Sequence, residues 1–381
     1  MDIAKIAPTD AAADILFHPY RGDGLEVPNR IAMAPMTREF ARGGVNGEDK
    51  LVYYRRRAAG GVGLIITEGT WIDVPSASNR AEAPRFYGED ALAAWKRIVQ
   101  AVHSEGARIM PQLWHTGMAR VPGTGAHPDA PSQGPSGIDK SYRQVVPPMG
   151  VRDIEATVDA YARAAVAAKE IGCDGVELHG AHGYLIDQFF WERTNLRSDR
   201  YGGDLKARTR FAVEFVHEIR RRCGSGFPVA LRFSQWKFGD YAIRMFATPR
   251  DLEIFLDPLV AAGVDIFHAS TRRYWDAAFE GSPLGLAGWT KKLTGRTTIA
   301  VGSVTLRAPF DPKASLAAGD LNHSEADRSL APLIERMERG EFDLIALGRT
   351  LLTNPDWPQL VREGRMDALR PYDATARDTL D

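Results

Sequence analysis

The sequence predicts an α/β protein built as a single (β/α)8 TIM barrel, with an N-terminal hairpin and long loops after the third and seventh strands. Three observations lead to this prediction. Eight short apolar runs of strand type recur along the 381 residues, and helical stretches separate most of them. Such βα alternation is typical of a parallel sheet, and eight units favour closure into a barrel. The first strand is not followed by a GxGxxG turn, so a doubly wound dinucleotide-binding sheet is the weaker alternative.

Each predicted strand is a short run of apolar, often β-branched residues, usually closed by a polar residue or glycine. In chain order the runs cover residues 30–35, 62–69, 107–115, 174–180, 228–234, 264–270, 297–303 and 342–349. We expect a single domain over residues 1–381, with its core at about 14–360 and a short C-terminal tail.

The helices between the strands are predicted from apolar residues at helical spacing. Asp90 is expected to cap a helix that ends near Gly106, and Asp153 to cap one that ends at Gly172. Residues 211–219 carry the apolar stripe of a further helix, and Thr248 followed by proline marks the start of another.

Three stretches do not follow the alternation of strands and helices. Residues 13–29 predict a hairpin with its turn at "RGDG", placed to close the bottom of the barrel. Residues 116–150 are rich in glycine, proline and serine and predict a long excursion after the third strand. Residues 304–327 are expected to form a loop after the seventh strand. Loops that follow barrel strands build the active site, so the first long loop is expected to serve function.

Composition excludes several classes of protein. Lys and Arg number 48 and Asp and Glu 49, a formal net charge of −1, which is not the basic footprint of a nucleic-acid-binding protein. Cys173 and Cys223 form no CxxC pair, so a disulfide scaffold is excluded and a reducing compartment fits. The chain shows neither a signal peptide nor an apolar run of about 18 residues. We expect a cytoplasmic monomer or homodimer that acts on a small molecule, with no nucleic-acid or membrane partner.

Polar residues cluster where the predicted strands end. Arg232 lies inside an apolar strand, where a charge is costly unless paired, so its partner is either a carboxylate or an anionic ligand. Gly302 and Gly348 are turn glycines by default, but the loops after strands seven and eight commonly bind phosphate in barrels. Arg349 can add a bidentate phosphate contact. The barrel reading therefore predicts a phosphorylated heterocycle, such as flavin mononucleotide, across the barrel top.

His179 and His182 stand three residues apart at the end of the fourth strand, with Tyr184 just beyond them. A lone histidine at a strand end is more often structural. A zinc site is the rival interpretation of the pair, but a catalytic zinc site needs a third ligand and the HExxH pattern is absent. We therefore predict no metal.

Seven segments, in order and at matching spacing, resemble one known family. They read RIAMAPMTR, LIITEGT, PQLWHTG, ELHGAHGYLIDQFF, TNLRSDRYGG, LRFS and ALGRTLLTNPDW. Together they resemble the old yellow enzyme family of FMN-dependent ene-reductases on a (β/α)8 barrel. The resemblance runs from about residue 14 to about residue 360.

The resemblance implies a role for each matching residue toward FMN. The phosphate would be held by the glycines and their neighbours after strands seven and eight, and the ring would rest on strands one, two, three and five. Thr37 would hydrogen-bond the C4 side, Gln112 the pyrimidine edge, and Arg232 would lie near N1. The implied FMN-binding residues are Pro35, Met36, Thr37, Gly69, Gln112, Arg232, Gly302, Ser303, Gly348 and Arg349.

The resemblance also implies the reaction, which is reduction of the activated C=C bond of α,β-unsaturated carbonyl or nitro compounds with NAD(P)H as reductant. His179 and His182 would hydrogen-bond the substrate carbonyl, where enolate charge develops. Flavin N5 would deliver the hydride and Tyr184 a proton to the α-carbon, while Trp114 would shape the substrate pocket.

The sequence departs from the family pattern in four places. Residues 233–242, after Arg232, differ from the expected form, and residues 307–327 are an insertion. Residues 201–211 replace the usual asparagine-arginine form after the two glycines, and the chain end shows no obvious aromatic segment to line the pocket. Two alternative functions remain open. One is an oxidative enzyme on the same cofactor, such as an amine demethylase, and the other is a flavin-free barrel lyase or binding protein.

Overall fold

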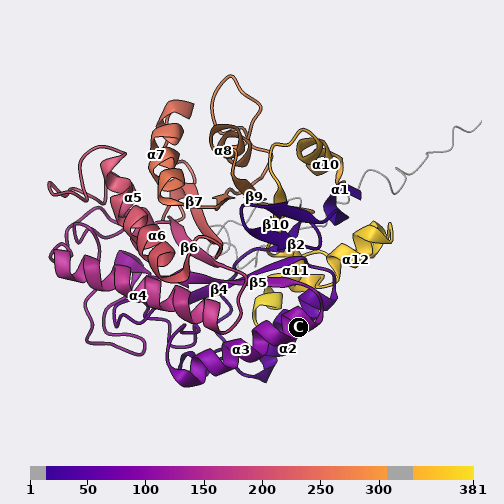
Figure 1. Ribbon diagram of the computed structural model, residues 1–381, viewed down its shortest axis with the longest axis horizontal. Coiled ribbons are helices and arrows are strands. Elements are labelled where there is room, and N and C mark those ends of the chain that lie inside the picture. Colours follow the sequence, from indigo (N-terminus) through magenta and orange to yellow (C-terminus); the bar gives the residue numbers. More distant parts are fainter. Residues whose placement is uncertain (1–13, 307–328) are drawn as a thin grey trace, which may run out of the picture.

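A closed barrel of eight parallel strands forms the centre of the molecule. The computed structural model describes residues 14–306 and 329–381. Its barrel order is β10-β3-β4-β5-β6-β7-β8-β9, with helices around the outside (Figure 1). The strands are β3 (Ile31–Met33), β4 (Leu64–Trp71), β5 (Arg108–Trp114), β6 (Val176–His182), β7 (Val229–Lys237), β8 (Ile266–Ser270), β9 (Thr297–Val301) and β10 (Leu344–Leu347). All eight predicted strands are therefore confirmed, and β7 runs three residues further than expected.

Helices cross over between successive strands, as a right-handed parallel arrangement requires. They are α2 (Glu48–Ala59), α3 (Glu89–Ser104), α4 (Val151–Glu170), α5 (Leu185–Phe190), α6 (Arg210–Cys223), α7 (Pro249–Ala262), α8 (Leu286–Thr294) and α10 (Ala331–Glu338). After β10 come α11 (Thr350–Thr353) and α12 (Trp357–Arg362), and α1 (Asp14–Phe17) opens the described chain. Short 3-10 turns lie at Arg42–Gly44, Gly117–Ala119, Ala207–Thr209, Met366–Ala368 and Ala374–Arg377.

The predicted caps of two helices are wrong by two or three residues. Gly88 and Gly150 occupy the N-cap positions of α3 and α4, because glycine readily adopts the extended or positive-φ backbone that precedes each helix. Asp90 and Asp153 lie in the first turns, where a carboxylate favours the helix N-terminus. Asp153 accepts the Gly150 N–H at 3.0 Å. The Thr248 cap is confirmed, since its hydroxyl accepts the Asp251 N–H.

The N-terminal hairpin closes one end of the barrel, as the sequence predicts. Strands β1 (Tyr20–Gly22) and β2 (Leu25–Val27) pair around the Asp23–Gly24 turn. Leu25 and Val27 pack onto the residues that fill the barrel interior. The Asp23 carboxylate accepts the Thr297 N–H at 2.6 Å, which ties the turn to the start of β9. This plug leaves the opposite end of the barrel, where the strands end, for a binding site.

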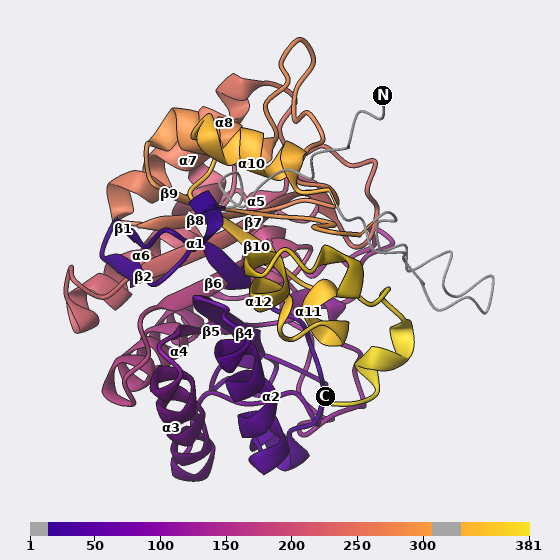
Figure 2. The ribbon, with the colours of Figure 1, turned by 90° about the vertical axis from the view of Figure 1, so that its right-hand side faces the viewer.

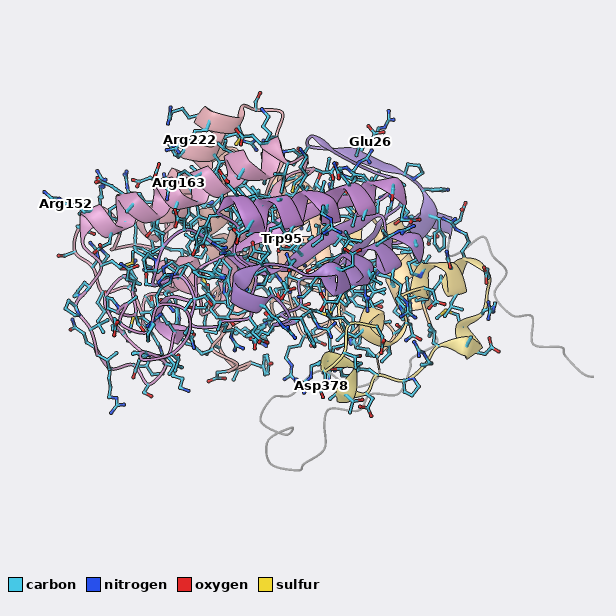
Figure 3. The ribbon with its side chains drawn as sticks, turned by 90° about the horizontal axis from the view of Figure 1, so that it is seen from below. Glu26, Trp95, Arg152, Arg163, Arg222 and Asp378 are labelled. Carbon is cyan, nitrogen blue, oxygen red and sulfur yellow. The ribbon has the colours of Figure 1, made fainter. Side chains whose placement is uncertain are left out.

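A second apolar core lies between the barrel and its helices. Trp95, on the inner side of α3, is 1% exposed. In contrast, Arg152, Arg163 and Arg222 extend outward from α4 and α6 (Figure 3). Both cysteines are buried and free. Among the described residues, no helix is long and apolar enough to cross a membrane.

The long loop after β5 is confirmed, because residues 115–150 contain only one 3-10 turn. The expected loop after the seventh strand lies mostly outside the described residues. The C-terminal segment returns from α12 past α2 (Figure 2), where the Arg57 guanidinium donates to the Asp381 carbonyl oxygen at 2.5 Å.

Candidate active site

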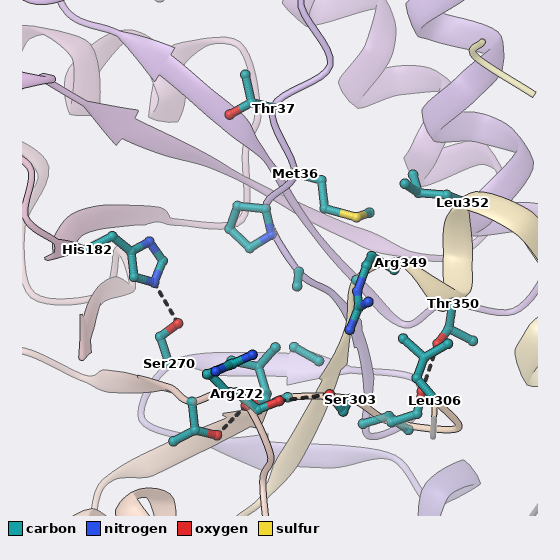
Figure 4. A pocket seen from close by; sticks show the side chains of 18 of the residues that line it. Met36, Thr37, His182, Ser270, Arg272, Ser303, Leu306, Arg349, Thr350 and Leu352 are labelled. Atoms are coloured by element: carbon teal, nitrogen blue, oxygen red, sulfur yellow. Dashed lines mark hydrogen bonds between the residues drawn. The ribbon is translucent and has the colours of Figure 1, made fainter. Parts of the chain in front are cut away.

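A cavity of about 550 Å³ opens at the C-terminal ends of the strands. This volume lies within the usual range of small-molecule sites. The walls come from the end of β6, from β7, β8, β9 and β10, and from the loops that follow β3 and these strands (Figure 4). Nine of the residues singled out from the sequence line it: Pro35, Met36, Thr37, His182, Arg232, Gly302, Ser303, Gly348 and Arg349.

The lining of this cavity is strongly cationic. No Asp or Glu is among the described residues that line it. Six arginines are: Arg38, Arg80, Arg232, Arg272, Arg349 and Arg377. Guanidinium groups gathered around a cavity favour an anionic ligand, and their planar forks suit phosphate.

The two glycines after β9 and β10 serve different purposes. Gly302 has φ +146°, and a Cβ there would lie 2.8 Å from the Arg272 carbonyl carbon, so backbone packing alone requires glycine. Ser303 closes this contact by donating its hydroxyl to the Arg272 carbonyl oxygen at 2.8 Å. At Gly348 the nearest atom to a Cβ is the Met36 sulfur at 3.6 Å. Gly348 therefore leaves the backbone open toward the cavity, as a phosphate site requires.

Arg232 has the first of the two partners that the sequence left open, a carboxylate. It lines the cavity, and the fully buried Glu177 carboxylate attracts its charge. Burial lowers the pKa of the Arg232 guanidinium, and Glu177 opposes that shift. Glu177 is held in turn by the Gln112 amide at 2.8 Å and by Nδ1 of His268 at 2.7 Å. Sequence reasoning missed Glu177, although an acid inside the apolar run "VELHG" carries the same signal as Arg232.

The predicted substrate-binding side chains form one ring cluster. The His179 and His182 rings are perpendicular with centroids 5.0 Å apart, and the Tyr184 ring lies 5.0 Å from His179. Trp114 meets Tyr184 edge to face at 5.2 Å. His182 alone of these four lines the cavity, so the cluster stands beside it.

Burial sets the protonation states of this cluster. It lowers the pKa of both histidines well below the usual value, and the positive charge of Arg232 adds to the effect. It raises the pKa of the Tyr184 phenol. The two imidazoles are therefore neutral and the phenol protonated at physiological pH, which leaves three potential proton or hydrogen-bond donors.

Two of the predicted cofactor residues lie outside the cavity lining. Gly69 stands opposite Gln112 in the β4–β5 register, and a Cβ there would lie 2.9 Å from the Trp114 ring. Gly69 thus makes room for Trp114. Gln112 is buried beneath the site with its amide on Glu177.

A buried ion pair fixes the segment that carries Thr37. Lys50 of α2 pairs with Glu68 of β4, and both side chains are fully buried. The second carboxylate oxygen of Glu68 accepts the N–H groups of Arg38 at 3.0 Å and Glu39 at 3.3 Å. The loop after β3 is therefore tied to the neighbouring strand.

Aromatic residues that the sequence did not assign complete the walls. Trp236 stacks on His182 with centroids 4.3 Å apart and planes 14° from parallel. Tyr372 lines the cavity and carries the Arg349 guanidinium at 5.4 Å from its centroid. The expectation of a chain end without an aromatic pocket segment is therefore wrong, because the C-terminal segment folds back over the barrel. The departure from the family pattern after Arg232 could have indicated that Trp236 lines the cavity. A single tyrosine near the end of the chain, Tyr372, gave no such indication.

Comparison with known proteins identifies the family. The model of the NADH:flavin oxidoreductase / NADH oxidase family matches residues 15–368. The 12-oxophytodienoate reductase 1 of Oryza sativa subsp. japonica is 34% identical over 390 residues, which cover 99% of this chain and 93% of that protein. The chain belongs to the old yellow enzyme family. Members of this family use FMN as cofactor and NAD(P)H as reductant, and the arginine-lined cavity fits such an anionic group.

Further relatives of this old yellow enzyme family member agree. The NADH oxidase of Thermoanaerobacter brockii is 34% identical over 367 residues, but the chain spans only 52% of its length. The Old Yellow Enzyme of a Pichia species superposes with a TM-score of 0.77 at 27% identity, covering 95% of this chain and 90% of that one. Morphinone reductase gives a TM-score of 0.75 at 26% identity, covering 95% and 92%. Among the described residues, no group of three His, Cys, Asp or Glu side chains could hold a metal ion.

Proposed function

We propose that this protein is an FMN-dependent ene-reductase that uses NAD(P)H to reduce the activated C=C bond of α,β-unsaturated carbonyl or nitro compounds. The observation that carries the proposal is the cluster of His179, His182 and Tyr184, neutral donors gathered beside an arginine-lined cavity. The names of two relatives, a 12-oxophytodienoate reductase and a morphinone reductase, support reductase activity.

The cavity residues suit the parts of FMN. Ser303, Gly348 and Arg349 would hold the phosphate, and Thr37 and Arg232 would face the ring. Arg232 keeps its charge beside Glu177, and a fixed cation at that place stabilises negative charge on the reduced ring. When bound, FMN supplies the hydride that it has accepted from NAD(P)H.

The histidine pair polarises the substrate. Each neutral imidazole has one N–H to donate, and two donors on one carbonyl oxygen make the β-carbon electrophilic. They also stabilise the enolate oxygen as charge develops there. Ser270 orients one of them, since its hydroxyl lies 2.7 Å from Nε2 of His182.

Tyr184 supplies the proton. Burial raises its pKa, so the phenol is protonated throughout the physiological range. A phenol is a weak acid, but an enolate carbon is a strong enough base to accept its proton. The Trp114 edge holds the ring in place at 5.2 Å.

The test is a visible spectrum followed through one turnover. The protein with FMN is expected to be yellow, to bleach with anaerobic NADPH and to regain colour when cyclohexenone is added. The Tyr184→Phe variant should bleach at the rate of the wild type and regain colour more slowly. Bleaching without recovery in the wild type would refute ene-reduction and favour oxidative chemistry on the same cofactor. Equal recovery rates for the two proteins would refute the role of Tyr184.

A further inference from the structure

A buried ion pair lies next to the turn of residues 182–184, which carries His182 and Tyr184. Nζ of Lys237 lies 2.6 Å from a carboxylate oxygen of Asp187, and both side chains are 1% exposed. Lys237 ends β7, within the stretch that departs from the family pattern, and Asp187 lies in the first turn of α5. No step proposed above uses either residue.

Hydrogen bonds connect each member of the ion pair to the His182–Gly183–Tyr184 turn, directly for Asp187 and through Ser234 for Lys237. The other carboxylate oxygen of Asp187 accepts the Gly183 N–H at 2.7 Å. The Lys237 ammonium also donates to the Ser234 carbonyl oxygen at 2.8 Å, and the Ser234 hydroxyl accepts the His182 N–H at 3.1 Å. Asp187 is therefore hydrogen-bonded to the backbone of the turn, and Lys237 to the backbone of the neighbouring strand β7.

The turn needs such support because its backbone is strained. His182 has φ +66°, a strained conformation that a side-chain-bearing residue keeps only where its surroundings impose it. Lys237 stands opposite His182 in the β6–β7 register, after an irregularity in the pairing. The strained residue and the buried cation are thus direct neighbours across two strands.

A buried ion pair contributes little net stability compared with well-packed apolar residues, because both charges lose their hydration. What it does supply is directionality, since each charged group here has fixed hydrogen-bond partners. The flat contact between Trp236 and the His182 ring adds a second restraint on the orientation of that ring.

We propose that Lys237 and Asp187 are positioning residues, which hold the His182–Tyr184 turn so that the imidazole and the phenol meet the substrate together. This inference rests on the proposed function. Removing the ion pair should leave FMN binding and flavin reduction unchanged, because neither residue lines the cavity. It should weaken phenol binding and slow reoxidation by the enone, because both depend on the placement of the imidazole and the phenol.

The test variant is Lys237→Met with Asp187→Asn, which removes both charges together and keeps an oxygen for the Gly183 N–H. The matched control is Lys291→Met with Asp343→Asn. That pair, 2.8 Å apart, also holds a backbone amide, Thr298 N–H at 2.9 Å, but lies where β9 and β10 begin. Phenol titration followed by the long-wavelength charge-transfer band measures donor geometry without turnover.

The double variant should bind phenols and regain colour with cyclohexenone roughly ten- to a hundred-fold less well, as expected when reacting groups are misplaced. Its FMN content and its rate of bleaching by NADPH should match those of the wild type, and the control should match the wild type throughout. Phenol affinity and recovery rate equal to wild type would overturn the proposal. A wild type that neither binds phenols nor recovers with the enone would instead refute the proposed function.

If the double variant does not fold with FMN, Lys237→Met alone provides the decision. The buried Asp187 carboxylate can then be neutralised by a proton and still accept the Gly183 N–H, so only one side of the support is lost and a smaller loss of phenol affinity is expected. An unchanged affinity in this folded variant would also overturn the proposal.

Discussion

Histidines that the fold buries in the neutral state make the protein sensitive to acid, and His115 offers a clear test. This residue follows β5 and is 1% exposed. Nδ1 accepts the Gly117 N–H at 3.0 Å. Burial lowers the pKa of its imidazole from 6.5 to about 3. Since the folded pKa lies below the unfolded one, the stability that depends on it is present above pH 6.5 and is lost as pH falls toward 3.

The size of the effect follows from proton linkage. Between about pH 7 and about pH 5.5 the unfolded chain takes up most of one proton at this site and the folded chain almost none. The integrated loss is about 1.3 kcal/mol of unfolding free energy for His115 alone. Burial also lowers the pKa of His179, His182 and His268, so the whole loss should be several times larger.

The perturbation is His115→Asn, whose side-chain oxygen can still accept the Gly117 N–H. Urea unfolding at the two pH values, with FMN at one fixed concentration, should give a difference in unfolding free energy about 1.3 kcal/mol smaller than in the wild type. His217→Asn, which changes an exposed histidine of α6, should leave the difference unaltered. A His115→Asn protein with the full pH dependence of the wild type would refute the reasoning.

Three further predictions concern the cavity and its supports. Gly302→Ala should weaken FMN binding about ten-fold or more, because a Cβ there strikes backbone, whereas Gly226→Ala, with open space around it, should bind FMN normally in a fluorescence titration. Glu68→Gln should lower the free energy of unfolding by about 3–5 kcal/mol in urea denaturation, because it leaves the buried Lys50 ammonium unpaired. The control Glu26→Gln, at an exposed ion pair, should change it by less than about 1 kcal/mol. His182→Ala should weaken the charge-transfer complex with phenols, as judged by absorbance.

Each of these has an outcome that contradicts it. Normal FMN affinity in the Gly302 variant would mean that the loop after β9 does not shape the site. A small stability change in the Glu68 variant would mean that its ion pair is dispensable. An unchanged phenol titration would remove His182 from the ligand site.

Local pattern in the sequence was enough to predict the barrel. A strand buried on both faces must be a continuous apolar run, and a surface helix must carry an apolar stripe, so both leave their period in the chain. The Asp23–Gly24 hairpin is equally local. Helix starts were less well determined, because a glycine and an aspartate two or three residues apart can each occupy the cap, and only backbone geometry decides between them.

The main features of the site could also be anticipated. Parallel strands of a barrel all end at one rim, so polar residues at strand ends must meet there whatever their separation in sequence. By that argument the sequence alone places His182, Arg232 and Gly348 at one rim, and all three line the cavity. A charge inside an apolar strand, as at Arg232, predicted a partner of opposite charge.

Tertiary structure alone decided which residues are the partners. Glu177 lies on a neighbouring strand, Lys237 reaches Asp187 across fifty positions, and Tyr372 arrives from the end of the chain. Such pairings depend on register, strand twist and the path of the returning tail, none of which has a period in the sequence. The sequence by itself therefore determined the barrel and the rim where chemistry gathers, whereas long-range packing determined the charge balance, the orientation of the donors and the walls of the cavity.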